Sequence, residues 1–556
     1  MSKALTRAEV ACLILLTLGA FGIRLFGASA TSLAEDEATI WESVQQYAQG
    51  HFAGVNSEHP MLLKTLAWAS YSLGERWNHW ASVHSFPQAA EETWLRLPNL
   101  IFGALTTPVL FLLAREMIGD AGAWSAAFFW AFTPLPIMLN RVLKEDTPLA
   151  FFTLLAIYFF WLAKRDPDES HFVRWLDLSA ICFGLSMASK YVPLYFGLNA
   201  LVWHVAGGMG LDRRGWTRHF WRVGLVMGIA FVVANPVILA PSNLASMLHY
   251  LKGIREHYGY NLDGTLYLNI FRTTPFGIPP YFYLWALAVK TPLPVLVAFV
   301  IGGFLLLRDQ KSMASIFFRA MVLITLLGMS LVTGKWFRYL VSELPFIYLA
   351  AGYGCQKLYD WYRSQKRGPL EQTIFALALL GLLVWPLVDT LSWFPYYQLY
   401  LNGLGGSRSN AGRYFGPDEI NDVAARQEVA AACRIATPGA GIALSNPMSA
   451  EFYLPRCHRP DIQIVPLFDV DYVPRPGDVI VLQDSRRYYE TEGLFDLMER
   501  MGGPHVDIQV RPWVGPPVTT ARIYQFLPVR ASRSQHPAKP GTVAAANKRF
   551  PFEARL

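Results

Sequence analysis

Long apolar segments alternate with short polar ones through the first 394 residues of this 556-residue chain. A helix that crosses the hydrocarbon core of a bilayer needs about 20 predominantly apolar residues, and runs of near that length recur in this part. The pattern therefore predicts about eleven transmembrane helices. They fall near residues 9–29, 97–114, 122–139, 147–163, 176–189, 191–207, 223–240, 281–307, 316–334, 338–356 and 372–394.

The first apolar run shares features with a secretory signal. The N-terminal sequence MSKALTR is basic, and ASATS resembles a signal-peptidase site. We interpret the run as an uncleaved span, because its apolar part is long and the chain after it continues as a membrane protein.

Lysine and arginine residues are unevenly shared between the loops. Basic residues near span ends are retained on the cytoplasmic side, so the richer set of alternate loops is predicted to be cytoplasmic, beginning with the N-terminus. With an odd number of spans, the chain after about residue 395 then lies outside. The basic residues of the cytoplasmic set are Lys3, Arg7, Arg115, Lys164, Arg165, Arg174, Arg213, Arg214, Arg218, Arg222, Arg308, Lys311, Arg319, Lys357, Arg363, Lys366 and Arg367.

Two predicted outer loops, 30–96 and 241–280, are too long to be simple turns. In the first, ATIWESVQQYA and MLLKTLAWASYSLGERW carry apolar residues at helical spacing without enough length to cross. We expect them to form helices at the membrane interface. In the second, TTPFGIPPYFY contains prolines that break a helix, and we interpret this loop as a cover over a site.

The pattern changes after residue 395. Residues 395–415 are predicted to be a linker, and 416–528 a small extracytoplasmic α/β domain. Its strands are expected at GIALS, IQIVPL, DVIVLQ, VDIQVRP and ARIYQF. The tail 529–556 is polar, basic and proline-bearing, which predicts disorder or a loose contact with anionic lipid.

Composition agrees with a polytopic α-helical membrane protein. Hydrophobic residues make up 53% of the chain and charged residues only 16%, which excludes an ordinary soluble domain. The net charge of +7 is scattered over short loops, so it does not indicate a nucleic-acid partner.

The orientation brings several charged residues to the outer face: Asp36, Glu37, Glu145, Asp146, Lys190, Lys335 and Arg338. Lys290 differs, because it lies about ten residues inside a predicted span, where an unpaired charge costs at least ~2.5–3.5 kcal/mol. We expect Lys290 to meet an anion. A purely structural pairing with a carboxylate is the alternative.

Several short motifs in this chain together resemble one superfamily, the polyprenol-dependent glycosyltransferases of the C class (GT-C). These include protein O-mannosyltransferases and the lipid A aminoarabinose transferase. The order and spacing of the motifs are specific for the superfamily, not for one substrate. They are EDEATIWE, HPMLLKTL, RLPNLIFGAL, RVLKEDTPLAFF, GLSMASKYVPL, VKTPLP and GKWFRYLVSELPFIYLAAG.

The resemblance implies transfer of a sugar from a polyprenyl phosphate to an acceptor on the outer face. Asp36 matches the acidic motif and is predicted to be the base, with Glu37 orienting the acceptor or Asp36. Adjacent helical residues point about 100° apart, so we expect one of the two to be structural. The alternative for both is an acidic helix start that favours the helix dipole.

The resemblance also implies a second acidic position and a cradle for the donor phosphate. Asp146 matches that position, and Glu145 precedes it; the pair could instead cap a helix. Lys190, Lys290 and Arg338 are predicted to bind the phosphate, although Lys190 could simply extend its charge to the membrane interface.

Two further residues complete the predicted substrate site. His59 stands where some relatives carry a basic residue, so it is expected to contact phosphate or acceptor, or else only to begin a helix. Tyr339 follows Arg338 and is included as substrate-binding. Direct displacement predicts inversion at the sugar carbon. We assign no cofactor and no metal, because no His/Cys cluster or carboxylate spacing indicates one.

Cys433 and Cys457 share the predicted outer domain, where an oxidising compartment would allow a disulfide. The expected location is a bacterial plasma membrane, and the expected partners are the lipid-linked donor, membrane lipids and an acceptor lipid, glycan or protein. A membrane transporter or flippase is the alternative function, although no inverted repeat is evident. A non-catalytic scaffold is a further alternative.

Overall fold

A computed structural model describes most of the chain. The described residues are 4–54, 56–191, 213–253, 260–262, 265–267, 278–309, 312–331, 335–365, 368–411, 423–445, 447–467, 472–484, 492–501 and 505–526. The predicted span 191–207, apart from residue 191, and the predicted tail 529–556 lie outside these residues, as does much of the predicted cover in 241–280.

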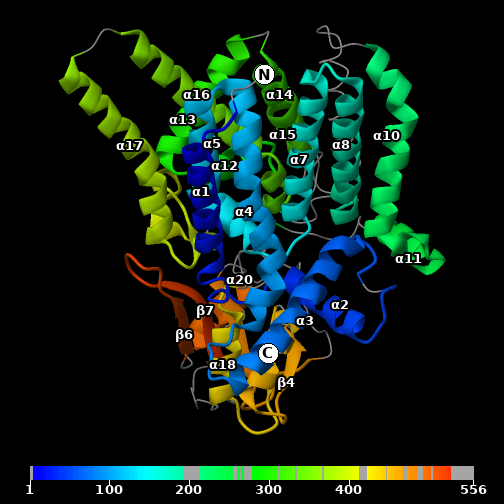
Figure 1. Ribbon diagram of the computed structural model, residues 1–556. Helices are drawn as coiled ribbons and strands as arrows, with labels where there is room; N and C mark the ends of the chain where they lie inside the picture. Colours follow the sequence, from blue (N-terminus) through cyan, green and yellow to red (C-terminus); the bar gives the residue numbers. More distant parts are fainter. Residues whose placement is uncertain are drawn as a thin grey trace, which may run out of the picture.

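A bundle of helices forms the larger part of the molecule, and a smaller sheet domain lies below it in Figure 1. The helices α1, α4, α7, α8 and α10 pack side by side, while α17 leans away from the bundle. The helices of the bundle and of the outer loops are α1 (Arg7–Leu25), α2 (Glu35–Ala48), α3 (Met61–Val83), α4 (Glu91–Ile118), α5 (Asp120–Phe132), α6 (Pro134–Asn140), α7 (Asp146–Arg165), α8 (Glu169–Ser189), α10 (Arg213–Ala234), α11 (Pro241–Gly253), α12 (Phe282–Lys290), α13 (Leu293–Arg308), α14 (Met313–Phe317), α15 (Thr325–Leu331), α16 (Leu344–Ser364) and α17 (Pro369–Ser392).

Six helices in the described part are long and apolar enough to cross a membrane, or seven if α5 and α6 count as one bent span. The sequence predicted about eleven. One predicted span, 191–207, lies outside the described residues apart from residue 191, so the two counts do not cover the same part of the chain. Within the described residues, the apolar run 281–307 is split into α12 and α13, and the run 338–356 begins with a short 3₁₀ segment, Phe337–Ser342, before α16. The length of an apolar run does not show where the helix within it is broken.

Prolines account for two of the breaks. The axes of α5 and α6 differ by 54° across Thr133, and α12 ends at Lys290 just before Thr291 and Pro292. A residue that precedes proline is pushed into extended backbone, and both threonines have ψ above 130°. The breaks turn the chain near the end of the bundle that faces the sheet domain.

Helices α13 and α16 approach each other closely because Gly302 has no side chain. A Cβ atom at this position would clash with the main-chain carbonyl of Ala350. Close backbone contact at small residues is typical of helices that pack within a membrane. This contact fixes α16, which follows directly after the segment that carries Arg338.

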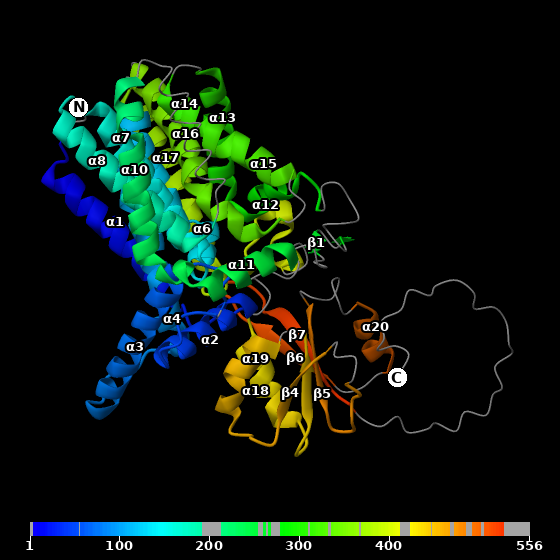
Figure 2. The ribbon, with the colours of Figure 1, turned by 90° about the vertical axis from the view of Figure 1, so that its right-hand side faces the viewer.

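The two helices of the first outer loop have different orientations. Helix α2 lies below the bundle, next to the sheet domain, whereas α3 points away from the bundle beside the outer end of α4 (Figure 2). The sequence predicted that both would lie at the membrane interface. Helix α3 packs against the outer part of α4, where Ser70 Oγ donates to the carbonyl oxygen of Trp94 at 2.6 Å and Gly74 lies against the Trp94 ring.

The smaller domain contains a five-stranded sheet with the strand order β4-β3-β5-β7-β6. Strand β3 runs parallel to β4 and β5, while β7 is antiparallel to β5 and β6. Side chains of β5 alternate between a face covered by α18 and a face covered by α20. The elements are α18 (Ala425–Ile435), β3 (Gly441–Leu444), α19 (Pro447–Tyr453), β4 (Gln463–Pro466), β5 (Val479–Gln483), α20 (Glu492–Met501), β6 (His505–Val510) and β7 (Val518–Gln525). A separate two-stranded pair, β1 (Tyr260–Leu262) and β2 (Thr265–Tyr267), belongs to the second loop.

Cys433 and Cys457 form a disulfide in the sheet domain, with their Cα atoms 6.3 Å apart. It links α18 to the short 3₁₀ segment Leu454–Cys457 that follows α19. The described residues of the bundle contain three free cysteines, Cys12, Cys182 and Cys355.

Candidate active site

A buried ion pair shapes the chain just before α2. Arg96 on α4 donates from Nε to Glu37 Oε1 at 2.7 Å and from Nη2 to Glu37 Oε2 at 2.6 Å. The same guanidinium donates to the main-chain oxygens of Ala28, Thr31 and Ser32. Arg96 thus fixes the turn that leads from α1 into α2, and with it the position of Asp36.

Glu37 also reaches the loop between α6 and α7. Its Oε1 accepts from the main-chain N–H of Leu143 at 2.8 Å, and its side chain is fully buried. Asn99, one turn after Arg96 on α4, donates to the carbonyl oxygens of Val142 and Lys144. Glu37 and α4 therefore hold together the turn before α2 and the loop between α6 and α7. The sequence had predicted a catalytic role for Glu37.

Asp36 lies between two cations from distant parts of the chain. Its Oδ2 is 2.8 Å from Lys144 Nζ and 3.0 Å from Arg338 Nη1. The Asp36 side chain keeps 38% of its surface exposed, whereas those of Lys144 and Arg338 keep 6% and 15%. The carboxylate therefore has one side toward solvent and the other toward buried positive charge.

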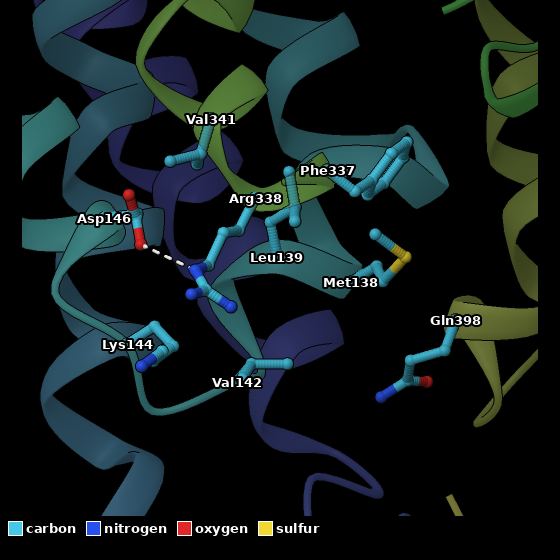
Figure 3. A pocket seen from close by; sticks show the side chains of 9 residues that line it. All are labelled: Met138, Leu139, Val142, Lys144, Asp146, Phe337, Arg338, Val341 and Gln398. Carbon is cyan, nitrogen blue, oxygen red and sulfur yellow. Dashed lines mark ion pairs between the residues drawn. The ribbon is translucent and has the colours of Figure 1, made fainter. Parts of the chain in front are cut away.

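Asp146 is the second carboxylate of this site. It begins α7, and its Oδ1 is 2.6 Å from Lys190 Nζ. Its Oδ2 is 3.7 Å from Arg338 Nε (Figure 3). Lys190 Nζ also lies 4.5 Å from the centre of the Tyr339 ring. Asp36, Lys144, Asp146, Lys190 and Arg338 form one group, which we call the ion-pair cluster.

Glu145 and His59 adjoin the ion-pair cluster. The buried Glu145 carboxylate is 3.7 Å from Lys144 Nζ and 3.8 Å from His59 Nδ1, and neither of its oxygens has a hydrogen bond within the described part of the chain. Burial lowers the pKa of His59 below its usual value, while Glu145 opposes this change. His59 is therefore neutral near pH 7.

Lys290 contacts the site indirectly. Its Nζ donates to the main-chain oxygen of Gln398 at 2.8 Å and lies 6.0 Å from the centre of the Phe337 ring. Both Gln398 and Phe337 line the cavity described next. The structure gives this buried lysine a carbonyl partner at the end of a broken helix, and its direct contact with the donor phosphate stays a prediction.

A small cavity opens beside the ion-pair cluster (Figure 3). Its free volume of about 10 Å³ holds roughly one water molecule. Asp36 is not part of its lining but contacts both of its cations from the more exposed side. The lining residues are Met138, Leu139, Val142, Lys144, Asp146, Phe337, Arg338, Val341 and Gln398.

The charges around Asp36 change its acidity. Burial raises the pKa of the Asp36 carboxyl, but Lys144 and Arg338 lower it by more, so the pKa lies below the usual value for aspartate. Burial lowers the pKa of Lys144, but Asp36 and Glu145 together raise it by more, so this pKa lies above the usual value for lysine. Both groups are therefore ionised at neutral pH, so Asp36 and Lys144 form an ion pair of a carboxylate and an ammonium group.

Sequence reasoning missed two residues of this site. Lys144 lies next to the acidic pair in RVLKED, and Arg96 begins RLPNL. Both belong to motifs that carried the resemblance, but neither was assigned a role. The available signal was the position of these two basic residues inside polar motifs at the ends of predicted spans. Among the residues that the structure describes, no group of three or more His, Cys, Asp or Glu side chains is arranged to hold a metal.

Comparison with solved structures identifies the architecture. ArnT from Cupriavidus metallidurans bound to undecaprenyl phosphate superposes with a TM-score of 0.54 at 15% identity, covering 94% of this chain and 98% of that one. The apo oligosaccharyltransferase from Archaeoglobus fulgidus gives a TM-score of 0.51 at 13% identity, covering 86% and 70%. This chain is a GT-C fold membrane protein.

Sequence comparison gives a partial match within the GT-C proteins. The sequence profile of the dolichyl-phosphate-mannose-protein mannosyltransferases matches residues 76–239. Dolichyl-phosphate-mannose–protein mannosyltransferase 6 from Candida albicans is 27% identical over 200 residues. That match covers 33% of this GT-C chain and 23% of the relative, so the chain spans about a quarter of the curated protein.

Proposed function

We propose that this protein is a glycosyltransferase that moves a sugar from a polyprenyl phosphate to a hydroxyl or phosphate acceptor on the outer face of a bacterial plasma membrane. The observation that carries the proposal is the contact of Asp36 with both Lys144 and Arg338. A proton acceptor and two cations next to a cavity are the groups that displacement of a phosphate by a hydroxyl requires.

In the proposed reaction, Asp36 takes the proton of the acceptor hydroxyl, and the acceptor oxygen forms a bond to the anomeric carbon. The bond between that carbon and the phosphate oxygen breaks, and its electron pair remains on polyprenyl phosphate. Attack and departure on opposite faces give inversion. The partly exposed side of Asp36 suits an acceptor that arrives from solvent, while Arg338 lines the cavity on the other side.

The donor phosphate is proposed to replace carboxylates as the partner of the cations. In the present arrangement Arg338 contacts Asp36 and Asp146, and the cavity has room for about one water molecule. When the phosphate takes over Arg338, Asp36 loses one of its two cations. Its pKa then rises toward the usual value, which makes it a stronger base when the donor is bound.

The other residues of the site have supporting roles in this proposal. Lys190 and Asp146 fix each other and place Tyr339 and Arg338 around the sugar and phosphate. Glu145 and His59 present polar atoms for sugar hydroxyls. Glu37 acts as a positioning residue through Arg96 and Leu143 rather than as a catalytic residue.

The decisive experiment follows sugar transfer by the purified protein in nanodiscs. Radiolabelled polyprenyl-phosphate sugars, pentose and hexose, are supplied with an envelope extract, and released polyprenyl phosphate and labelled product are measured. Release that requires Asp36 supports the proposal. Movement of intact donor between leaflets without cleavage would instead identify a flippase, the alternative function.

A further inference from the structure

A second cavity, of about 360 Å³, lies in the sheet domain outside the ion-pair cluster. One wall is α18, and the other is the end of α19 with the 3₁₀ segment after it. The lining contains four arginines and no carboxylate, and consists of Arg426, Ala430, Cys433, Arg434, Tyr453, Arg456, Cys457 and Arg459. We call it the arginine cavity.

The geometry of the arginine cavity is fixed by covalent and helical constraints. Cys433 and Arg434 lie seven and eight residues after Arg426 on α18, about two helical turns, so both lie on the side of the helix that carries Arg426. The disulfide from Cys433 to Cys457 joins this wall to the opposite one. The guanidinium groups of Arg426 and Arg456 lie over the ring of Tyr453 at 5.4 Å and 4.9 Å. The arginines are therefore held toward one another.

Carboxylates contact these arginines but do not line the cavity. Glu92 is buried and lies 2.6 Å from Arg426 Nη2 and 3.0 Å from Arg456 Nη1. Arg456 also pairs with Glu91, and Arg459 pairs with Asp461. Within the described residues, three of the four guanidinium groups therefore pair with three carboxylates.

Two donors of the arginine cavity remain available. Arg434 is exposed and has no ion pair with any residue that the structure describes. Arg426 Nε is buried without a hydrogen-bond partner in the same part of the chain. Buried donors without partners are rare in proteins, and an Arg fork matches the oxygens of phosphate.

We propose that the arginine cavity binds one phosphate-type oxyanion, as a free phosphate ester or as the phosphate of a lipid headgroup. Its volume exceeds that of a single phosphate, so a sugar or glycerol attached to the phosphate also fits. The site is separate from the proposed donor cradle at Arg338, since the two cavities have no lining residue in common.

The arginine cavity is connected to the chain that carries Asp36. Arg426 donates from its main-chain N–H to Ser32 Oγ at 2.9 Å and from Nη2 to Ser29 O at 2.8 Å. Ser32 precedes Asp36 by four residues, at most about 14 Å of extended chain. The arginine cavity is therefore linked to the proposed base through one short stretch of chain. Any role in delivering an acceptor rests on the proposed function, whereas phosphate binding itself does not.

The test is equilibrium dialysis of the full-length protein in detergent against radiolabelled inorganic phosphate at constant ionic strength. We expect two binding components, one lost in Arg338→Gln and the other weakened about tenfold or more in Arg434→Gln. Arg511→Gln is the matched control, because Arg511 is an exposed arginine of the same domain outside the cavity.

The two proposals can fail separately. Equal phosphate binding by Arg434→Gln and Arg511→Gln would overturn the arginine cavity as a phosphate site, whatever happens to sugar transfer. Loss of the Arg434-dependent component alone supports it even if no transfer is found. The two sources of phosphate are distinguished by repeating the dialysis in phosphatidylcholine nanodiscs with and without phosphatidylglycerol. If phosphatidylglycerol competes with inorganic phosphate, the site binds a lipid headgroup. If it does not compete, the site binds a soluble phosphate ester.

Discussion

Arg338 contacts Asp36 across the candidate site, with 3.0 Å between Nη1 and Oδ2, although the two residues come from opposite ends of the membrane part. The same guanidinium lies 3.7 Å from Asp146. One arginine therefore links both acidic motifs. Because Arg338 already contacts these carboxylates, we expect that it must release at least one of them to bind the donor phosphate.

Replacing Asp36 by Asn should reduce transfer by about 10²–10⁴-fold, the usual contribution of a general base. The amide keeps the size of the side chain but cannot accept the acceptor proton. Glu35→Gln is the control, since Glu35 is an exposed neighbour with the same charge. Release of polyprenyl phosphate measures the effect. Full activity of Asp36→Asn would remove Asp36 as the base.

The acid side of the pH–rate profile should shift when Lys144 is replaced by Met. Burial raises the pKa of Asp36, and Lys144 is the largest influence that lowers it. In the native protein the carboxylate stays ionised well below neutral pH, and activity is lost only as pH falls through the lowered pKa. Without Lys144 the pKa rises, so the loss begins at higher pH.

The measurement for Lys144→Met is kcat/KM from pH 4 to pH 8, with Arg76→Gln on the exposed face of α3 as the control. Arg76 lies outside the ion-pair cluster, so its variant should keep the native profile. An unchanged acid limb in Lys144→Met would mean that Asp36 does not control this part of the profile.

The sequence was enough to predict the membrane fold, because the lengths of the apolar runs indicate it. Short polar motifs were enough to single out Asp36, Asp146, Lys190 and Arg338. The contacts between them were not. Sequence shows that adjacent residues on a helix diverge, but not that Glu37 is the one directed into the protein toward Arg96. That outcome depends on α4 packing against the turn before α2.

Lys290 and Lys144 illustrate the same limit. Apolar length predicted one helix over 281–307, and this placed Lys290 deep in a span, whereas the chain breaks just after Lys290 and gives it the carbonyl of Gln398. Lys144 was treated as an ordinary loop residue. Its role depends on Asp36, more than one hundred residues earlier in the sequence, and no local pattern reports such a contact.

Removing one partner of the Glu37–Arg96 pair should destabilise the protein by about 3–5 kcal/mol, because it leaves a buried charge without its counterion. Thermal unfolding in detergent of Glu37→Leu, Arg96→Leu and the double variant measures this. The double variant should lose less than the sum of the single ones, and Glu35→Gln should be near native. A Glu37→Gln variant with native stability but no transfer would instead make Glu37 catalytic.

Helix packing at Gly302 should be sensitive to a single methyl group. Gly302→Ala introduces a Cβ against the carbonyl of Ala350, and overpacking of this kind costs about 1–3 kcal/mol. Gly381→Ala on the open face of α17 meets nothing and should gain up to about 1 kcal/mol of helix propensity. Comparison of their unfolding temperatures checks the contact, and equal stability would contradict it.

The sheet domain should influence the rate of transfer through Tyr453. Its hydroxyl accepts from the main-chain N–H of Leu33 at 2.8 Å, three residues before Asp36. In Tyr453→Phe this buried N–H loses its partner, which costs about 1–3 kcal/mol and allows the chain before the proposed base to move. We expect kcat to fall several-fold while KM for the donor stays near its native value.

Tyr472→Phe separates this positioning effect from general destabilisation of the sheet domain. Tyr472 donates its hydroxyl proton to Asp478 Oδ2 at 2.9 Å, a bond within the domain that does not involve the chain leading to Asp36. Both variants should lower the unfolding temperature, but only Tyr453→Phe should lower kcat. If the two variants lose the same fraction of kcat at the same loss of stability, the sheet domain supports the fold without positioning Asp36.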